Sequence, residues 1–560
     1  MPESPTARVH PAEQHPELDG QPRVAPRHAN VVILSAAQSA VARWGGIGVL
    51  ILASAAVALW HLALAPGQWF VFDEFDYFTK GHDPLIVWLL RPHNEHTIAF
   101  TKIWYNALLP IVGLRHYILY LVPLVLAHLV VVAAIYRLTW ISTASQVVAA
   151  GTALIAAVMG AGAGTLTWAG QFQYVGSVAA GLIAIVLAFE ARTRRRIAAV
   201  GVIALFGTLN GTAFVALGLA AALAYAYHRR WPEAVLMSAI PVAWQLVIRL
   251  VWAPANPYAA GSLGEILRVG PSFIFSVLDT AISQTVGYQP MSAALLVSIA
   301  VGTLALLFGH VSRHTRLAGP VIGTLALATV VSMAALVAGR LGRGAELAGG
   351  GGYSYLFLAT LIPMVGILLG QLARSKAALF AVAGMMVVIS SIGYGKITDD
   401  ARALSAWKLD GERLIQASAA LLVEGLPTYM EQMPVPDTAP TVSQDMIRFW
   451  VAAGQLDALP VSPGATDQAS LNMQWRLIPG QEVAGQCISP VIGEHIAVPP
   501  GAELSVSGLS SGTAITIHYP TSPAQRQFDL SNSVSVLQSV AARAASVSVV
   551  AGSARVCIAE

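Results

Sequence analysis

Long apolar runs recur along the first 395 residues of the chain. Each is about 20 residues long, which a helix needs to cross the hydrocarbon core of a bilayer. A stretch at 271–288 is apolar but interrupted, so we predict an interfacial or re-entrant segment there. The pattern otherwise predicts an α-helical polytopic membrane protein with about eleven transmembrane helices, at approximately 44–65, 117–137, 146–166, 174–190, 197–209, 212–228, 233–252, 291–309, 317–339, 353–372 and 377–394. The fifth and sixth are separated only by Asn210 and Gly211, so they would form a tight hairpin or one broken element.

Composition supports this class. Of the 560 residues, 56% are hydrophobic and only 11% are charged, and the mean hydropathy is +0.64. A soluble domain carries roughly 25% charged residues. The charges are segregated along the chain, so the net charge of +3 does not indicate one basic surface of the kind that binds nucleic acid. We therefore predict membrane lipid as a partner and no nucleic acid.

Basic residues occupy alternate connections between the predicted helices. Short loops rich in Lys and Arg stay on the cytoplasmic side of a membrane. The basic positions are Arg137, Arg192, Arg194, Arg195, Arg196, Arg229, Arg230, Arg313, Arg316, Arg374 and Lys376. We therefore predict a multi-pass protein of the inner (plasma) membrane with a cytoplasmic N-terminus. The other connections, among them 66–116, 167–173, 253–290 and 340–352, would face outward, and so would everything after about 395.

The two ends of the chain differ from the predicted bundle at 44–395. Residues 1–43 carry Pro, His and Arg with little periodicity, which predicts a disordered cytoplasmic tail. Beyond 395 an amphipathic helical pattern leads into a polar, Pro-rich stretch. Short Val- and Ile-rich runs follow between Gly, Pro and Ser, at 496–498, 504–506, 514–518, 534–537 and 547–550. They predict a mainly-β or α+β extracytoplasmic domain within 396–560.

The chain has two cysteines, Cys487 and Cys557, and both lie in this C-terminal part. An oxidising exterior compartment favours a disulfide between them. It would close a loop of about 70 residues, worth on the order of 4 kcal/mol. Two unrelated buried thiols are the alternative.

An acidic cluster follows the first predicted helix. The stretch Phe72-Asp73-Glu74-Phe75-Asp76-Tyr77-Phe78 sets three carboxylates among four aromatic residues. Carboxylates this close repel one another unless a cation, a proton or a substrate relieves them. The loop that they begin, 66–116, is much longer than a helix connection needs. Asp73, Glu74 and Asp76 are therefore candidate catalytic residues.

A second polar group lies in the same loop, at Arg91-Pro92-His93-Asn94-Glu95-His96. His93, Glu95 and His96 are candidate substrate-binding residues. Glu74, Glu95 and His96 also offer ligands for a divalent cation such as Mg²⁺ or Mn²⁺, although the HExxH spacing of zinc proteases is absent. An amphipathic run follows that would lie in the membrane interface, with Asn94 as its N-cap.

Two further outward-facing segments carry candidate substrate-binding residues. Trp168, Gln171 and Gln173 stand at the ends of the third and fourth predicted helices, where an aromatic face and amides can hold a sugar ring. The alternative is an aromatic belt with helix-capping amides.

The last outer loop contains Arg340, Arg343 and Glu346, then the glycine run 349–352 and Tyr353. Arginines on the outer side oppose the usual charge bias, so we expect them to bind phosphate, either of a substrate or of lipid headgroups. The glycine run would form a mobile lid.

Taken together, these features resemble the GT-C class of membrane glycosyltransferases. The likeness lies in the long first outer loop with its acidic residues, the interfacial helix, the bundle of about eleven helices and the outer C-terminal domain. The acidic pair of that class corresponds to Asp73 and Glu74, with Asp76 as a rival for the second position.

The resemblance implies transfer of a sugar from a polyprenyl-phosphate donor to a glycan, lipid or protein acceptor of the bacterial cell envelope. Asp73 would act as the base on the acceptor hydroxyl, and Arg340 or Arg343 would stabilise the departing phosphate. A single displacement would invert the anomeric centre.

Two other classes compete with this interpretation. A transporter or flippase for lipid-linked precursors would carry ionisable residues inside its spans. His128, Gln245 and Arg249 are the few polar residues within or near the predicted spans, and the sequence shows no internal repeat. A non-catalytic membrane scaffold, whose C-terminal domain binds a partner, is the third class.

Overall fold

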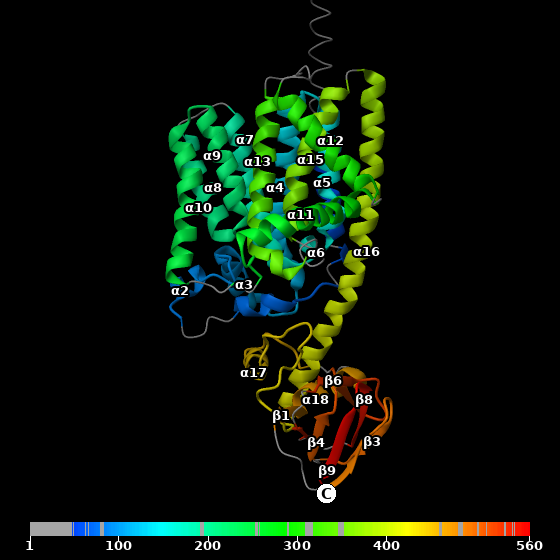
Figure 1. The fold of residues 1–560 in the computed structure, drawn as a ribbon. Helices are drawn as coiled ribbons and strands as arrows, with labels where there is room; N and C mark the ends of the chain where they lie inside the picture. The colour runs from blue at the N-terminus through cyan, green and yellow to red at the C-terminus, as the bar shows by residue number, and fades with distance from the viewer. Residues whose placement is uncertain are drawn as a thin grey trace, which may run out of the picture.

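The computed structural model (Figure 1) describes most of the chain. The described residues are 48, 50–61, 63–64, 67–78, 83–190, 195–252, 256, 258–287, 290–308, 317–344, 352–373, 375–458, 462–479, 485–500, 503–510, 512–530, 534–539, 541 and 544–559. Several predictions concern residues outside these ranges, namely the tail 1–43, Arg192, Arg194, Arg313, Arg316, Arg374, Glu346 and the glycines 349–351.

Within the described residues, eight helices are long and apolar enough to cross a membrane. They are α4 (Tyr117–Thr143), the broken helix Gln146–Leu166, the helix Ala169–Phe189 that contains α7 (Phe172–Phe189), α10 (Trp231–Val251), α11 (Leu263–Val286), α13 (Ala318–Arg340), α15 (Gly352–Leu372) and α16 (Lys376–Val423). Shorter apolar helices are Leu50–His61, α8 (Arg195–Asn210), α9 (Ala213–Tyr227) and α12 (Pro290–Leu307). The predicted helical, multi-span class is confirmed at this level, whereas the number and direction of the spans remain predictions.

Large apolar side chains are exposed on the outside of these helices. Leu52 is 70% exposed, Leu250 is 83% exposed and Phe380 is 77% exposed. Water would make such surfaces unfavourable, whereas lipid tails solvate them. The bundle is therefore suited to contact with membrane lipid.

The fifth and sixth predicted helices form the tight hairpin that the sequence suggested. α8 ends at Asn210 and α9 begins at Ala213, so Gly211 and Thr212 make the whole connection. The side-chain amide of Asn210 donates to the carbonyl of Phe172, 3.1 Å away. A Cβ at Gly211 would lie 2.9 Å from a backbone carbonyl of α7, which explains the need for glycine.

The third predicted helix, 146–166, is not one continuous span. It consists of α5 (Gln146–Ala157), η3 (Gly160–Gly162) and α6 (Ala163–Leu166). The chain passes so close to α11 at Gly160 that a Cβ there would collide with the carbonyl oxygen of Gln284. The carbonyl of Ala157 lies 3.2 Å from Nε2 of His128 on α4. Close packing and this polar contact therefore stabilise a break that hydropathy alone does not reveal.

Residues 271–286 of the stretch 271–288, predicted as an interfacial or re-entrant segment, lie in the continuous helix α11. Ser262 caps this helix by accepting from the N–H of Glu265 at 3.1 Å, and Gly287 ends it with φ of 76°. Pro271 lies inside the helix without ending it. In Figure 1, α11 runs across the bundle, whereas its neighbours run along it.

The first loop contains η2 (Phe72–Phe78), α2 (Leu85–Leu90) and α3 (Ala99–Val112). It lies at the end of the bundle that faces the C-terminal strands (Figure 1). α3 is the amphipathic helix that was expected, but Asn94 does not cap it, because the N-cap position is Ile98. Asn94 instead has a φ of 53° in a turn between His93 and His96.

The C-terminal part begins inside α16, which is one helix of 48 residues. It leaves the bundle and leads to α17 (Gln444–Ala452), α18 (Pro463–Gln474) and two antiparallel sheets (Figure 1). The sheets have strand orders β1-β7-β4-β9-β2 and β3-β8-β5-β6. Their strands are β1 (Trp475–Pro479), β2 (Gly485–Ile488), β3 (His495–Val498), β4 (Glu503–Gly508), β5 (Ala514–His518), β6 (Gln525–Asp529), β7 (Val534–Ser539), β8 (Ala545–Ala551) and β9 (Ala554–Ala559).

Each of the five predicted Val- and Ile-rich runs lies in one of these strands. Their alternate side chains, such as Leu504, Ile515, Leu537 and Val547, are fully buried between the sheets. The predicted β-rich C-terminal unit is therefore present as a sandwich.

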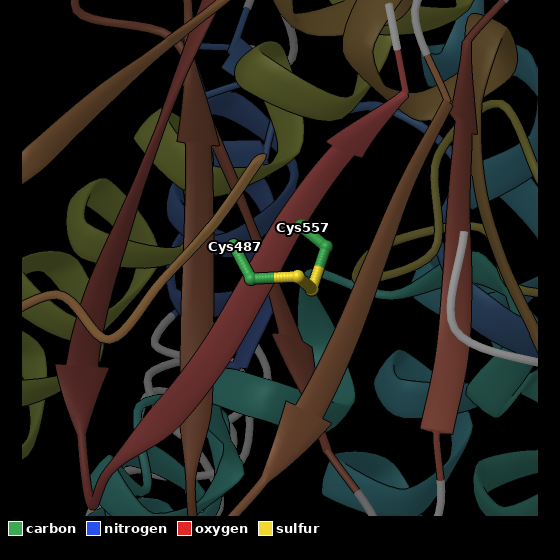
Figure 2. The surroundings of a disulfide bond; sticks show 2 residues. All are labelled: Cys487 and Cys557. Atoms are coloured by element: carbon green, nitrogen blue, oxygen red, sulfur yellow. A yellow bond between two sulfur atoms is a disulfide. The ribbon is translucent and has the colours of Figure 1, made fainter. Parts of the chain in front are cut away.

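A disulfide joins Cys487 and Cys557 with an S–S distance of 2.10 Å (Figure 2). The two residues face each other in the antiparallel pair β2 and β9. The sequence had left two unrelated thiols as the alternative, and this strand pairing is what brings the sulfurs together.

The segment 435–456 belongs to the core of the bundle and not to that of the sandwich. Val435, Ala439, Val442 and Trp450 are buried with the aromatic residues of the first loop. The Trp450 ring lies 5.9 Å from the ring of Phe75 in η2. The first loop and this part of the C-terminal region thus share one hydrophobic core, beyond the boundary expected near 396.

Candidate functional site

The acidic cluster forms the 3₁₀ helix η2, which separates its three carboxylates. A 3₁₀ helix has three residues per turn, so side chains three apart lie on one side. Asp73 and Asp76 therefore share the accessible side, and their side chains are 42% and 34% exposed. Glu74 lies on the other side and is fully buried.

His93 lies beside both Asp73 and Asp76. Its Nε2 lies 3.0 Å from Oδ2 of Asp73, and its Nδ1 lies 3.9 Å from Oδ2 of Asp76. One ligand atom from each of the three residues lies within 4.8 Å of the others. Two carboxylates and an imidazole suit a hard or borderline divalent cation such as Mg²⁺ or Mn²⁺.

Three neighbours act on the carboxyl group of Asp76. Partial burial and the like charge of Asp73 raise the pKa of Asp76, whereas a hydrogen bond from the hydroxyl of Thr441 and the nearby His93 lower it. Thr441 belongs to the C-terminal region, so that region contributes directly to the acidic group. We call Asp73, Asp76 and His93 the acidic site.

Glu74, predicted to be catalytic or a metal ligand, has a structural environment instead. Its carboxylate accepts hydrogen bonds from the hydroxyls of Tyr105 and Tyr117 and from the backbone N–H groups of Val71 and Gly170. Its distance to the Tyr117 hydroxyl is 2.9 Å. Burial raises the pKa of Glu74, and the hydrogen bonds from Tyr105, Val71 and Tyr117 and the charge of Lys408 oppose that shift. A carboxylate held in this way has no open side for a substrate.

Lys408 of α16 is the buried cation beside Glu74. Its Nζ donates to Oε1 of Gln68 at 2.7 Å and to the carbonyl of Thr167 at 2.5 Å. Burial lowers the pKa of Lys408 to about 8. Glu74 and Lys408 therefore connect the first loop to the long C-terminal helix from within the core.

The four-residue turn His93–His96 connects the acidic site to a second polar group. The N–H of His93 donates to the carbonyl of His96 at 2.8 Å, and the N–H of His96 donates back at 3.0 Å. His93 faces the acidic residues, whereas Glu95 and His96 line a cavity in the bundle. The turn thus links two sites that are adjacent in space.

Arg340 is the central cation of this second group. Its Nη1 forms a 2.8 Å ion pair with Glu95, and its Nε donates to the hydroxyl of Tyr353 at 2.7 Å. The side chains of Arg340 and Glu95 are 11% and 15% exposed, so water screens the pair only weakly. Asn256 lies 3.4 Å from the same guanidinium.

His96 is neutral in this environment. Burial and the charge of Arg340 lower the pKa of His96 to about 3. The hydroxyl of Thr212 lies 2.7 Å from its Nδ1. A neutral imidazole can accept or donate a hydrogen bond beside the cavity without adding positive charge.

The cavity has a volume of about 370 Å³ and lies between α9, α10, α13 and α15. Its polar lining consists mainly of Glu95, His96, Tyr174, Gln245, Arg249, Asn256, Arg340 and Tyr353. Its apolar lining includes Val215, Val331, Leu336, Leu356 and Phe357. The cavity is therefore amphiphilic, with arginines among its polar groups and aliphatic walls from the helices.

Other predicted substrate-binding residues lie around these two sites. The ring of Trp168 is 6.1 Å from that of Phe72, directly before Asp73. Gln171 and Gln173 are buried, and their side-chain oxygens have no hydrogen-bond partner among the described residues. Arg343 ends η5 (Leu341–Arg343), and its side chain lies outside the described parts.

The predicted metal ligands Glu74, Glu95 and His96 do not form one group. Glu74 is buried among tyrosines, Glu95 pairs with Arg340, and His96 contacts Thr212. Within the described residues, the group of three that could hold a cation is Asp73, Asp76 and His93. Two local features cause this difference: η2 turns Glu74 into the core, and the turn at Asn94 leaves His93 beside the acidic residues while Glu95 and His96 line the cavity.

Sequence reasoning missed Lys408, Thr441 and Asn256. Lys408 had a signal, since it lies on the buried stripe of α16 formed with Ala401, Gly411 and Ile415 at helical spacing. Thr441 and Asn256 have no local pattern that marks them. Only the tertiary structure brings them to Asp76 and Arg340.

Comparisons with protein-family models, with curated proteins and with solved structures gave no match to this chain.

Proposed function

We propose that this protein is a membrane glycosyltransferase that moves a sugar from a polyprenyl-phosphate donor to an envelope acceptor. The observation that carries the proposal is the turn His93–His96, which joins an acidic site to an amphiphilic cavity containing arginine. A lipid-linked sugar needs both, because its tail is apolar, its phosphate is anionic and its acceptor is a hydroxyl group.

The cavity fits the donor's chemistry. The phosphate would lie beside Arg340, in place of the Glu95 carboxylate, with Arg249 as a second cation. Positive charge at this point stabilises the phosphate as it leaves. The prenyl tail would lie along the aliphatic walls contributed by α13 and α15 and continue into the lipid.

The acidic site fits the acceptor's chemistry. Asp73 would take the proton of the acceptor hydroxyl while that oxygen forms a bond to the anomeric carbon. The bond from this carbon to the phosphate oxygen breaks at the same time, and polyprenyl phosphate departs with the electron pair. One displacement of this kind inverts the anomeric configuration.

A divalent cation held by Asp73, Asp76 and His93 would supply further positive charge next to the donor phosphate. A carboxylate has two oxygens, so Asp73 would offer one to the cation and the other to the hydroxyl. In this proposal Asp76, and not Glu74, is the second functional acid.

The positive-inside pattern supports a location in the plasma membrane with the acidic site and the sandwich on the outer side. Lipid-borne donors suit that side, because nucleotide sugars are cytoplasmic. The sandwich would then meet the acceptor glycan or lipid outside the cell.

The test compares Asp73→Asn with Asp410→Asn in cells that lack the wild-type protein. Asp410 is an exposed acid of α16 paired with Arg413, so it serves as the matched control. We expect Asp73→Asn to lower glycan product about 100-fold or more, the size of a general-base effect. Mass spectrometry of envelope glycans and transfer assays with extracted lipid-linked sugars measure it. Normal product from Asp73→Asn, at equal expression, would refute the proposal.

A transporter of lipid-linked precursors is the second candidate, favoured by the broken helix at η3 and the buried His128. His128 Nδ1 lies 2.8 Å from the hydroxyl of Tyr355, inside the bundle. Such buried polar groups at a helix break mark transport sites in other membrane proteins. His128→Gln distinguishes the two functions: a transporter would lose translocation of the precursor, whereas Asp73→Asn would leave it unchanged.

A further inference from the structure

A segment of the C-terminal region, residues 438–441, lies directly against the acidic site. The backbone N–H of Phe72, one residue before Asp73, donates to the carbonyl of Thr438 at 2.7 Å. On either side of Thr438, Val435 and Ala439 are buried in the core that includes the first loop. The segment is therefore bound to η2 through its backbone, and its Ala439 lies in the hydrophobic core that η2 shares.

The backbone of Phe72 requires such support. Its φ is 47°, in the left-handed region that a bulky residue rarely adopts. Strained residues of this kind persist where surrounding contacts hold them, and they concentrate at functional sites. Here the contacts are the hydrogen bond to Thr438 and the ring of Trp407 in α16, whose centroid is 5.1 Å from that of Phe72.

Asp76 is held from two directions. His93 approaches it from the first loop, with Nδ1 at 3.9 Å. The hydroxyl of Thr441 donates a hydrogen bond to it from the C-terminal segment. Thr441 is exposed, so it forms part of the rim of the acidic site and not of the hydrophobic core.

We infer that residues 438–441 complete the acidic site and that Thr441 is a positioning residue for Asp76. Its hydrogen bond fixes the rotation of the carboxylate, so that one oxygen faces Asp73 and His93. The C-terminal region is then part of the reaction centre as well as a neighbouring unit. This inference rests on the proposed function in one respect, that Asp76 and its neighbours bind a divalent cation.

The test measures Mn²⁺ binding by the full-length protein in detergent, at one pH near neutrality. Loss of a hydrogen bond that orients a metal-binding carboxylate weakens binding about 10- to 100-fold. We expect this effect for Thr441→Val and recovery to near the wild-type value for Thr441→Ser, which keeps the hydroxyl. Thr466→Val is the matched control, because Thr466 lies in α18, away from the acidic site. Thermal unfolding of each variant shows whether the fold is retained.

Unchanged Mn²⁺ binding by Thr441→Val would overturn the inference, and so would equal weakening by Thr441→Ser. Asp76→Asn shows whether binding occurs at this site, since it must lose most of the affinity. Absence of Mn²⁺ binding by the wild type would overturn this inference together with the cation site. Sugar transfer by the same preparation tests the proposed function separately, so the two failures can be told apart.

Discussion

Neighbouring acids of the first loop differ in role because of local geometry. The 3₁₀ helix η2 places Asp73 and Asp76 on its accessible side and Glu74 against Tyr105 and Tyr117. A carboxylate is therefore a candidate for chemistry at Asp73 and Asp76, whereas the carboxylate of Glu74 is a buried part of the core. Burial of Glu74 is compensated by four donors and by Lys408, as a buried charge requires.

Lys408 gives a pH-dependent prediction. Burial lowers its pKa from 10.5 to about 8. Between these two pH values the unfolded chain binds more protons at this site than the folded chain, so its contribution to the free energy of unfolding rises with pH. Lys408→Met removes this contribution. The melting temperature of the wild type should therefore rise relative to that of Lys408→Met as the pH increases from about 8 to 10.5.

Thermal unfolding in detergent at several pH values measures this difference. Lys396→Met is the control, because Lys396 lies on the same helix with a side chain that is 45% exposed. A constant difference between the wild type and Lys408→Met across the range would contradict the prediction.

At the level of elements, α16 is the connection between the two parts of the molecule. Its first half lies in the bundle, and its second half carries Trp407 and Lys408 to the first loop. Its end packs against α18 through Leu421 and Met473. One continuous helix therefore contacts both the first loop and the helix α18 that leads into the sandwich.

The disulfide belongs to the sandwich alone. It closes a loop of 70 residues between β2 and β9, a size for which loss of the cross-link costs on the order of 4 kcal/mol. The double variant Cys487→Ser/Cys557→Ser should therefore unfold its sandwich at a lower temperature. Because the sandwich has a separate core, Mn²⁺ binding at the acidic site should stay unchanged.

Differential scanning calorimetry with and without a reductant measures this effect, since reduction of the wild type should reproduce the variant. If the double variant also lost Mn²⁺ binding, the sandwich and the acidic site would not be independent in the way the two cores suggest.

For the whole molecule, the boundary between the two hydrophobic cores falls within the C-terminal region. Residues 435–456 complete the core of the bundle and first loop, whereas the sandwich begins at α18 and β1. Two polar contacts also connect the first loop to the end of this segment. The N–H of Leu114 donates to the carbonyl of Gln455, and Arg115 pairs with Asp457.

Truncation tests this division. A chain that ends at Ala458 keeps the buried residues Val435, Val442 and Trp450, so it should retain Mn²⁺ binding within a few-fold of the wild type. A chain that ends at Val423 lacks them and also lacks Thr438 and Thr441. It should lose most Mn²⁺ binding and aggregate more readily. Binding assays and size-exclusion chromatography compare the two chains, and equal behaviour would contradict the division.

Much of the fold was predictable because its signals are local. Hydropathy indicated the apolar helices, and alternating Val and Ile indicated strands such as β5 and β8. The break between α5 and α6 was not predictable, because it depends on the approach of α11 at Gly160. The extent of α11 was misjudged since Pro271 is tolerated within a helix whose ends are capped elsewhere.

The candidate site was predictable in part, because some of its residues also carry local signals. Asp73, Asp76, His93 and Arg340 were expected from charge in outward-facing segments, and the structure arranges them in two adjacent groups. Glu74, expected to be catalytic, is fully buried, and a sequence does not show which side of a short helix meets the core. Thr441 acts on Asp76 across more than three hundred residues of chain, so no local pattern identifies it.

By itself, the sequence determined the membrane class, the β-rich C-terminal unit, the cysteines available for a disulfide and the loop that carries the acids. These features follow from residue type and short-range periodicity, which act within one element. Only the tertiary structure decided which acids stay accessible, which residues surround Arg340 and which part of the C-terminal region adjoins Asp76. Those outcomes depend on packing between distant segments, where burial and hydrogen bonding give chemically similar side chains different roles.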